Sequence, residues 1–257
     1  MSELDDVKHE VAIANRILSE VGLATGVLAS LGHASFRLPS DPDKFVVKGR
    51  GYELDALAEM RPDQMVVCDI EGNYVSGPPG SSQCFEVKMH SCIMKTHPEI
   101  KSLVHVHPRY TVVMSVMQET LLPMCQEGIQ LVRRPLPVYP HVKTIQSDAE
   151  GMEVANLLGD SKAILFQGHG AATVGSSLSE AVMNMLQLEE QARMNWYAYC
   201  AGGPDHPFIP DELIEEMTNR PGLQELPHFA EVLRNQGGRP RVNGVYEYYK
   251  KRVSQDL

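Results

Sequence analysis

The apolar residues near the N-terminus recur every three to four positions, which is the spacing of one face of an α-helix. Residues 2–5 (SELD) precede this run and have the form of a capping box. Gly22 follows the run and is a typical residue at a helix end. The apolar positions are Val7, Val11, Ala14, Leu18 and Val21. The pattern therefore predicts an amphipathic helix that ends at Gly22.

Short strand-like runs come next. Residues 34–38 (ASFRL), 44–48 (KFVVK) and 64–70 (QMVVCDI) combine β-branched or aromatic side chains with the short length of strands. The last run turns through residues 71–73 (EGN) into residues 74–77 (YVSG). Strands that follow one another so closely predict an antiparallel arrangement in this part of the chain.

The second part of the chain alternates helices with strands. Residues 84–96 predict a helix and residues 102–107 a strand, and Pro108 is placed to open another helix at its first turn. Residues 162–171 (KAILFQGHGA) predict a buried strand that ends in a glycine-flanked histidine, and residues 179–200 a long helix. The sequence contains no GxGxxG unit of a doubly wound sheet, no repeat and no low-complexity tract.

We expect one α/β domain over residues 1–202, followed by an arm over residues 203–257 that packs on the same domain or on a neighbouring subunit. The chain has 257 residues, 43% of them hydrophobic, which is enough for one sizeable core. The arm is rich in proline and charge. Within it, residues 211–217 (DELIEEM) and 245–252 (VYEYYKKR) are the strong helical candidates.

The formal net charge of -10 argues against nucleic acid or an anionic membrane as a partner, because phosphate groups require a basic patch. A small-molecule or protein partner is expected instead. The N-terminus lacks the basic and apolar regions of a signal peptide, and no apolar run approaches the roughly 20 residues of a membrane span. The five cysteines form no CxxC pair and are typical of free thiols, so a cytoplasmic location is expected.

His105 and His107 are the first residues that suggest chemistry, because they occur one residue apart in a strand-like run. Side chains alternate along a strand, so the two imidazoles would point the same way. Two imidazoles at a strand end can bind a metal, or they can form a hydrogen-bonded, half-buried pair at a strand edge. This stretch alone leaves both alternatives open.

His169 is a candidate third ligand, because Gly168 and Gly170 let the backbone crowd a bound group. Three neutral imidazoles hold Zn²⁺ or a similar divalent ion and leave positions open for a substrate. Glu86 and His90 lie four residues apart in a predicted helix, so a carboxylate and another imidazole can approach that ion together. An ordinary polar helix surface is the alternative for Glu86.

Three segments together resemble the class II aldolase/adducin family, over about residues 9–200. They are residues 32–37 (GHASFR), 85–108 (FEVKMHSCIMKTHPEIKSLVHVHP) and 166–182 (FQGHGAATVGSSLSEAV). The resemblance implies an α/β/α domain with a mostly antiparallel central sheet flanked by helices. It also implies a homotetramer whose active sites lie between subunits.

The same resemblance implies a ligand set. One divalent ion per subunit, whether Zn, Mn, Fe or Co, would be held by His105, His107 and His169. Glu86 would be the acid-base group and an occasional metal ligand.

The chain departs from the sugar-phosphate aldolases of this family where they bind phosphate. Gly32–His33 stands in place of Gly-Asn, Arg50–Gly51 falls near a Thr-Gly turn, and Cys84–Phe85 replaces two serines before the catalytic glutamate. Cys and Phe cannot supply the hydroxyl donors that a phosphate dianion requires, and Phe adds an apolar stacking surface. A tyrosine that those aldolases have near Gln126 is also absent. A phosphorylated sugar is therefore not the expected substrate.

The GHxSxR form of residues 32–37, with an arginine at position 50, resembles the branch of the family that decarboxylates hydroxylated aromatic or pyridine carboxylic acids. By this resemblance Glu86 or His33 would protonate the ring carbon. Arginine suits a planar carboxylate because its guanidinium group bonds both oxygens, although for either arginine alone ordinary surface charge is the alternative. The residues expected to bind the substrate are Ser35, Arg37, Arg50 and Phe85.

The leading hypothesis is a metal-dependent carboxy-lyase that acts on a hydroxylated aromatic carboxylic acid such as a dihydroxyphthalate. The runner-up is a class II aldolase or epimerase that acts on a small sugar or hydroxy-carbonyl substrate. Both need the metal, so Cys84–Phe85 and Arg50 separate them better than the ligands do. A non-catalytic, adducin-like member of the family is a third class. It requires a lost metal site, whereas this chain retains the three histidines and Glu86.

Overall fold

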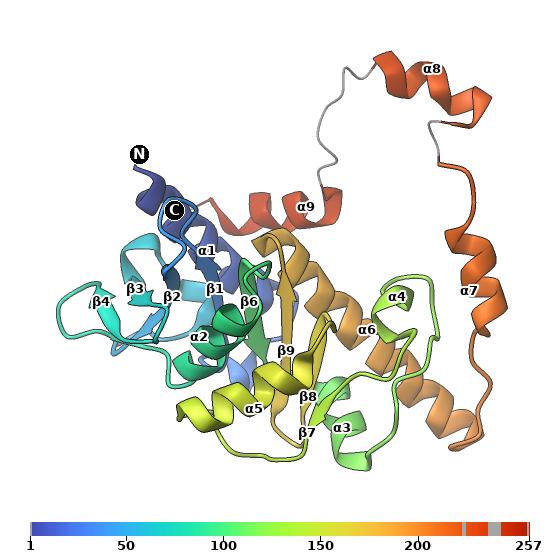
Figure 1. Ribbon diagram of the computed structural model, residues 1–257, viewed down its shortest axis with the longest axis horizontal. Helices are drawn as coiled ribbons and strands as arrows, with labels where there is room; N and C mark the ends of the chain where they lie inside the picture. Colours follow the sequence, from blue (N-terminus) through green and yellow to red (C-terminus); the bar gives the residue numbers. More distant parts are fainter. Residues whose placement is uncertain (1, 223–224, 236–242, 256) are drawn as a thin grey trace.

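The strands form a central sheet with helices on both faces (Figure 1), as described by a computed structural model for residues 2–222, 225–235, 243–255 and 257. The strand order is β4-β3-β2-β1-β6-β9-β8-β7, with β5 paired to β2. Every pairing is antiparallel except that of β7 with β8. The α/β/α fold with a mostly antiparallel sheet is therefore confirmed. The strands are β1 (His33–Arg37), β2 (Lys44–Arg50), β3 (Met65–Asp69), β4 (Tyr74–Ser76), β5 (Ser82–Gln83), β6 (Ser102–Val106), β7 (Val138–Tyr139), β8 (Ala163–Phe166) and β9 (Gly170–Gly175).

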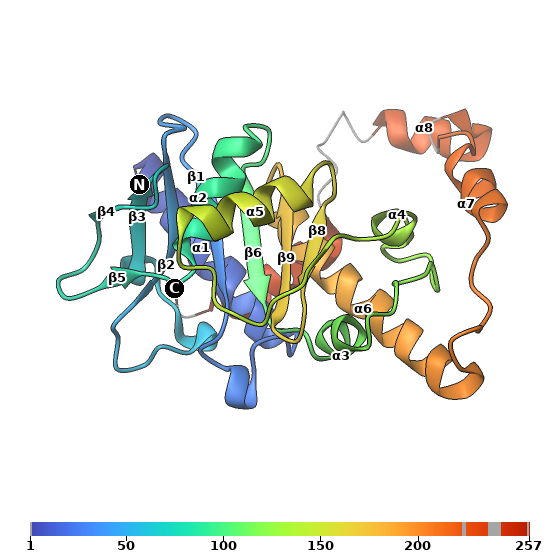
Figure 2. The same cartoon turned by 60° about the horizontal axis from the view of Figure 1, so that its bottom comes forward.

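Helices α1 and α6 cover one face of the sheet, and α2 and α5 cover the other (Figures 1 and 2). The shorter α3 and α4 lie beside the half of the sheet that carries β8. The helices are α1 (Glu3–Glu20), α2 (Val87–Thr96), α3 (Arg109–Met117), α4 (Ile129–Val132), α5 (Asp148–Leu158), α6 (Leu178–Gly202), α7 (Asp211–Thr218), α8 (Pro227–Asn235) and α9 (Gly244–Val253).

Alternation along the central strands decides which layer each side chain enters. On β6, Val104 and Val106 pack in the core between the sheet and α1 and α6, whereas Leu103 packs in the core under α2 and α5. His105 shares the face of Leu103 because strand side chains have a period of two. On β1, Ala34 packs on the α1 side, so its neighbours His33 and Ser35 point toward α2.

The element boundaries refine two of the predicted strands. β6 ends at Val106, so His107 lies just beyond the strand and not within it. The predicted buried strand over residues 162–171 is a hairpin, because β8 ends at Phe166 and β9 begins at Gly170. His169 therefore lies in the turn between two antiparallel strands.

The described parts of the arm contact the same chain near both of their ends. Arg133 beside α4 pairs with Asp211 of α7 through two hydrogen bonds, and Lys250 of α9 pairs with Glu10 of α1 at 2.6 Å. Figure 1 shows α7 and α8 outside the body of the domain and α9 returning to α1. The predicted helices over residues 211–217 and 245–252 correspond to α7 and α9.

None of the helices in the described part of the chain combines the length with the apolar character that a membrane span requires. The five cysteines are all unpaired. Burial raises the pKa of the Cys68 thiol to about 12, so this thiol stays protonated at neutral pH.

Candidate active site

The three histidines predicted as metal ligands meet at one end of the central strands. His105 lies on β6, in register with His33 on β1 and Ala172 on β9. Because β6 and β9 are antiparallel, the end of β6 meets the start of β9, and His107 comes to lie beside His169. The ring centroids of His107 and His169 are 4.7 Å apart, and each is 5.1 Å from that of His105.

Gly170 permits this approach of the two strands. A Cβ atom at this position would lie 2.5 Å from the carbonyl oxygen of Val106 and 3.0 Å from Cδ2 of His107. Gly168, on the other side of His169, has φ +68°, which suits the tight turn. A glycine at position 170 is therefore needed for close backbone approach, as the pattern indicated. The group that it approaches is the end of β6 with its two histidines.

Glu86 reaches the histidines from the layer of α2, as the residue that precedes this helix. Its Oε2 lies 3.1 Å from Nε2 of His105, and its Oε1 lies 3.9 Å from Nε2 of His169. The backbone N–H of Ile145 donates a hydrogen bond to Oε1 at 3.1 Å and so fixes the carboxylate. One donor atom from each of these four groups, the three histidines and Glu86, lies within 4.8 Å of the others.

The environment of His105 fits a bound cation. Its Nδ1 lies 2.9 Å from the carbonyl oxygen of Ala171, which can only accept, so Nδ1 is the protonated nitrogen of the ring. The buried Nε2 then presents a lone pair and has no hydrogen-bond partner among the described residues. It faces the Glu86 carboxylate at 3.1 Å, and two electron-rich atoms at that distance suit a positive ion between them.

The protonation states of the cluster also suit a metal. Burial, with His105 nearby, lowers the pKa of His107 to about 3, and burial lowers the pKa of His169 as well. The Glu86 carboxylate accepts a hydrogen bond from the N–H of Ile145 and lies 3.4 Å from Nε2 of His33, and donors to the charged form of a carboxyl group favour its ionisation. Neutral imidazoles and an ionised carboxylate are the forms that metal coordination requires.

His33 contacts Glu86 from the side of β1. Its Nε2 lies 3.4 Å from Oε2 of Glu86, and its Nδ1 lies 2.7 Å from Nε2 of His90. Burial lowers the pKa of His33 to about 4. His90 does not join the ligand cluster with Glu86, contrary to the sequence interpretation. It lies behind His33, and its Nδ1 is 2.6 Å from the hydroxyl of Ser35.

The structure does not bring Arg37 or Ser35 to the histidine cluster. The buried guanidinium group of Arg37 donates to the carbonyl oxygens of Pro42 and Met94, at the opposite end of β1 from His33. The hydroxyl of Ser35 is buried and engaged with His90. These alternate residues of β1 therefore fasten α2 to the sheet, because the α2 side covers the face to which they point.

Arg50 and Phe85 do lie together, and Phe85 directly precedes Glu86 in the chain. The guanidinium carbon of Arg50 is 4.4 Å from the centroid of the Phe85 ring, and Phe85 is 64% exposed. Asp55 pairs with Arg50 at 3.2 Å and also with Lys48. A guanidinium group paired with Asp55 thus lies against an exposed aromatic ring, next in the chain to Glu86.

Sequence reasoning missed Lys48 and Asp55. Lys48 is 1% exposed, and burial lowers its pKa although the hydrogen bond that it donates to Asp55 opposes that effect. The available signal was a lysine at the end of the apolar run KFVVK, which requires a counter-charge if it is buried. Nothing in the local pattern identifies Asp55 as that partner.

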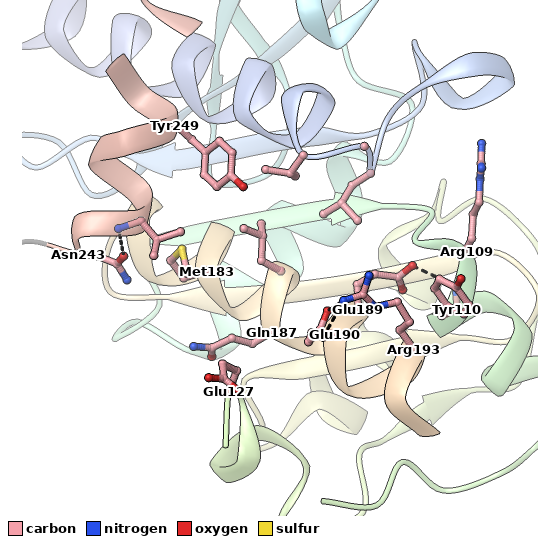
Figure 3. Close-up of a pocket in the computed structure, with 15 residues that line it drawn as sticks. Arg109, Tyr110, Glu127, Met183, Gln187, Glu189, Glu190, Arg193, Asn243 and Tyr249 are labelled. Carbon is pink, nitrogen blue, oxygen red and sulfur yellow. Dashed lines mark hydrogen bonds and ion pairs between the residues drawn. The ribbon is translucent and has the colours of Figure 1, made fainter. Parts of the chain in front are cut away.

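A separate pocket of about 780 Å³ lies where α3, α6, α9 and the end of α1 meet (Figure 3). Glu189 within it accepts hydrogen bonds from the N–H groups of Tyr110 and Thr111, both at 3.0 Å. This carboxylate caps the start of α3, directly after His107 and Pro108, and so helps to fix the end of β6. Burial raises the pKa of Glu189 although these donors lower it.

Residues 9–196 match the family model described as Class II Aldolase and Adducin N-terminal domain, and the chain belongs to this family. The chain is 29% identical over 211 residues to the 3,4-dihydroxyphthalate decarboxylase of Rhodococcus jostii (strain RHA1), with 79% of this chain and 84% of that protein covered. It is 27% identical over 223 residues to the protein of the same name from Terrabacter sp. (strain DBF63), with 84% and 90% covered.

A solved structure shares the fold. L-fuculose 1-phosphate aldolase from Glaciozyma antarctica PI12 superposes with a TM-score of 0.73 at 21% identity, with 98% of this chain and 89% of that chain covered.

Proposed function

We propose that the protein is a divalent-metal-dependent carboxy-lyase that removes CO2 from a hydroxylated aromatic carboxylic acid such as a dihydroxyphthalate. The observation that carries this proposal is the pairing of Arg50 with Phe85, the residue that precedes Glu86 in the chain. The exposed ring offers a stacking surface for an aromatic substrate, and the guanidinium group offers N–H donors to a carboxylate. The printed names of the two decarboxylase relatives support the same substrate class.

In this proposal His105, His107 and His169 hold one Zn, Mn, Fe or Co ion per subunit, with Glu86 at its edge. The ion supplies Lewis-acid stabilisation of negative charge on substrate oxygens. The hydrogen bond from His105 to Ala171 keeps the ring in the tautomer that a ligand requires.

Glu86 and His33 are the proposed proton-transfer groups. Loss of CO2 breaks the bond between the ring and its carboxylate, and the ring carbon keeps the electron pair and must take up a proton. Ionised Glu86 accepts the phenolic proton of the substrate and returns it to the ring carbon, after which water reprotonates the phenolate oxygen. One proton is consumed for each CO2 released. His33, at 3.4 Å from Glu86, is placed to exchange the same proton.

Substrate orientation is assigned to Arg50 and Phe85. Arg50 would grip a second carboxylate, and Phe85 would lie against the face of the ring. The breaking bond aligns with the π system only when the departing carboxylate is turned out of the ring plane. By holding the second carboxylate, Arg50 would orient the substrate and so contribute to the rate as well as to binding. We leave Ser35 and Arg37 out of the substrate contacts, because His90 and backbone carbonyls occupy their polar groups.

A panel of three substrates tests the proposal. The metal-loaded protein is given a hydroxyphthalate-type acid, the methyl ether of that acid and a sugar phosphate, and CO2 release and aldol cleavage are measured. We expect CO2 from the free phenol alone, because the ether has no phenolic proton to donate to Glu86. Equal rates with the ether, or cleavage of the sugar phosphate alone, would contradict the proposed reaction.

A class II aldolase or epimerase acting on a small sugar or hydroxy-carbonyl compound is the second candidate. One observation favours it: the same cluster of three histidines and Glu86 suits the negative charge of an aldol cleavage. The buried thiol of Cys84 and the ring of Phe85 weigh against a phosphorylated substrate, because neither donates a hydroxyl hydrogen bond.

We also propose a homotetramer in which a neighbouring subunit covers the site. Val116 and Val142 are 54% and 70% exposed, and both lie next to Gly168, with γ carbons 3.3 and 3.8 Å from the position of a Cβ atom there. Exposed apolar side chains beside His169 are favourable when another protein surface covers them. We assign the site to a domain over residues 1–202 and treat residues 203–257 as an arm.

A further inference from the structure

We propose that Ser35 and His90 are positioning residues that fix the tautomer of His33, so that the Nε2–H group of His33 faces Glu86. The inference rests on the proposed function in one respect, namely that Glu86 transfers the proton. The geometry itself is independent of which substrate the protein uses.

The four groups form a continuous line of contacts from β1 to the histidine cluster. The hydroxyl of Ser35 lies 2.6 Å from Nδ1 of His90, and Nε2 of His90 lies 2.7 Å from Nδ1 of His33. Nε2 of His33 then lies 3.4 Å from Oε2 of Glu86. All four side chains are buried, so water does not compete for these contacts.

The ionised Glu86 carboxylate fixes which atom donates and which accepts in each of these hydrogen bonds. The Glu86 carboxylate can only accept, so Nε2 of His33 must carry a proton. Nδ1 of the neutral His33 ring then accepts, and Nε2 of His90 must donate to it. Nδ1 of His90 accepts in turn, which leaves the Ser35 hydroxyl as donor. Each contact therefore has one donor and one acceptor, and a single arrangement of protons satisfies all of them.

A second metal site is the competing explanation for this cluster, because His33, His90 and Cys84 lie close together. The contact between the two rings argues against it. Two nitrogens bound to one tetrahedral ion at about 2.0 to 2.1 Å would be roughly 3.3 Å apart. The observed separation of 2.7 Å is that of a hydrogen bond.

The surroundings of His90 hold its ring in place. The ring stacks on Phe45 with an interplanar angle of 11° and a centroid distance of 6.3 Å. Both ring nitrogens are already engaged, by Ser35 and by His33. Arg37 holds α2, the helix that carries His90, farther along through the carbonyl oxygen of Met94. His90 is thus a rigid donor that is aimed at His33.

The donor of His90 decides whether His33 can exchange a proton with Glu86. Without the donor of His90, the His33 ring is free to carry its proton on Nδ1. A lone pair on Nε2 would then face the Glu86 carboxylate, which is unfavourable, and His33 would have no proton to exchange with Glu86. The line of Ser35 and His90 excludes that form.

Solid-state ¹⁵N NMR of the histidine-labelled zinc protein tests the inference, because protonated and unprotonated ring nitrogens have distinct shifts. The His33 signals are assigned by their loss in His33→Asn. We expect His33 to be protonated on Nε2 in the unsubstituted protein and to shift toward Nδ1 in Ser35→Ala and His90→Leu. Zinc stoichiometry should stay unchanged, and turnover of the hydroxyphthalate-type acid should fall roughly 10- to 100-fold.

Two further variants separate positioning from packing. His90→Gln can still donate an amide N–H toward His33 and should keep more Nε2 protonation and turnover than His90→Leu. Arg37→Met, the matched control on the same strand, should leave the His33 signals unchanged. Protonation on Nδ1 in the unsubstituted protein, or unchanged His33 signals in both Ser35→Ala and His90→Leu, would overturn the inference.

The spectra also keep this inference separate from the proposed function. If no acid in the panel releases CO2 but the His33 signals respond as expected, the tautomer assignment stands and the proposed reaction fails. If His90→Leu does not fold, the unsubstituted protein and Ser35→Ala decide the result.

Discussion

The backbone of Gly170 passes so close to Val106 that a Cβ atom at position 170 would lie 2.5 Å from the Val106 carbonyl oxygen. The same atom would lie 3.2 Å from Cε1 of His105 and 3.0 Å from Cδ2 of His107. One missing methyl group therefore lets the end of β6 and the start of β9 bring two histidines beside His169.

Gly170→Ala should consequently weaken both the fold and the site. We expect a loss of roughly 1–3 kcal/mol in the free energy of unfolding, which is typical of overpacking, together with weaker metal binding. Urea unfolding and metal titration measure the two effects. Gly244→Ala is the matched control, because a Cβ atom there meets nothing within 4 Å. Equal behaviour of the two variants would show that the close approach at Gly170 is unimportant.

Glu86→Gln should keep the bound metal and lose turnover. The three histidines remain, whereas the amide cannot accept and return a proton, so kcat should fall by roughly 10² to 10⁴. Metal analysis of the purified variant accompanies the rate measurement. His169→Ala is the comparison, because removal of a proposed ligand should lower the metal content as well. Turnover of Glu86→Gln at the unsubstituted rate would assign the proton to another group, with His33 next in line.

Local patterns were sufficient for some of the site. The glycines around His169 mark a place of close backbone approach, and the structure has that approach. The alternation of β1 likewise predicts that His33, Ser35 and Arg37 share one face. Which helix covers that face is long-range information that no local pattern contains. For this reason Arg37 and Ser35 were expected to bind substrate, whereas the structure has them holding α2.

Other elements were missed for different reasons. α5 has a local signal, because Ser147 and Glu150 form a capping box at its start. β7 has only two residues, Val138–Tyr139, and a strand so short has no periodicity to detect. The pairing of Lys48 with Asp55 depends on a loop returning to the end of β2, and so composition and spacing could not predict it.

Asp55→Ala should destabilise the protein because it leaves Lys48 buried without a counter-charge. Breaking a buried pair by removing one partner typically costs about 3–5 kcal/mol, and thermal or urea unfolding would measure the loss. The double variant Lys48→Met with Asp55→Ala should recover most of it, because an apolar side chain suits the buried position. A double variant as unstable as Asp55→Ala alone would mean that Asp55 acts through Arg50 instead.

Val116→Asp should disrupt the proposed tetramer while leaving the monomer folded. The side chain is 54% exposed in the single chain, so a charge there is tolerated in water but is costly inside an apolar interface. Light scattering gives the mass, and circular dichroism reports the fold. Val27→Asp is the control, because Val27 is 90% exposed and lies in a short 3-10 helix, Gly26–Leu28, whereas Val116 lies in α3. A tetramer that survives Val116→Asp would place the interface elsewhere.

Arg50→Met should discriminate between substrates with one and with two carboxylates. If the guanidinium group binds the second carboxylate, its loss removes a charge-assisted interaction worth about 1.5–3 kcal/mol, which is roughly a 10- to 150-fold rise in KM for the di-acid. The hydroxylated mono-acid lacks that group, so its kcat/KM should change little. Asp55 keeps its contact with Lys48 in this variant, which limits the structural disturbance. Measuring kcat/KM for both acids makes each the control for the other. An equal loss for both acids would mean that Arg50 supports the site through Phe85 and does not bind the substrate carboxylate.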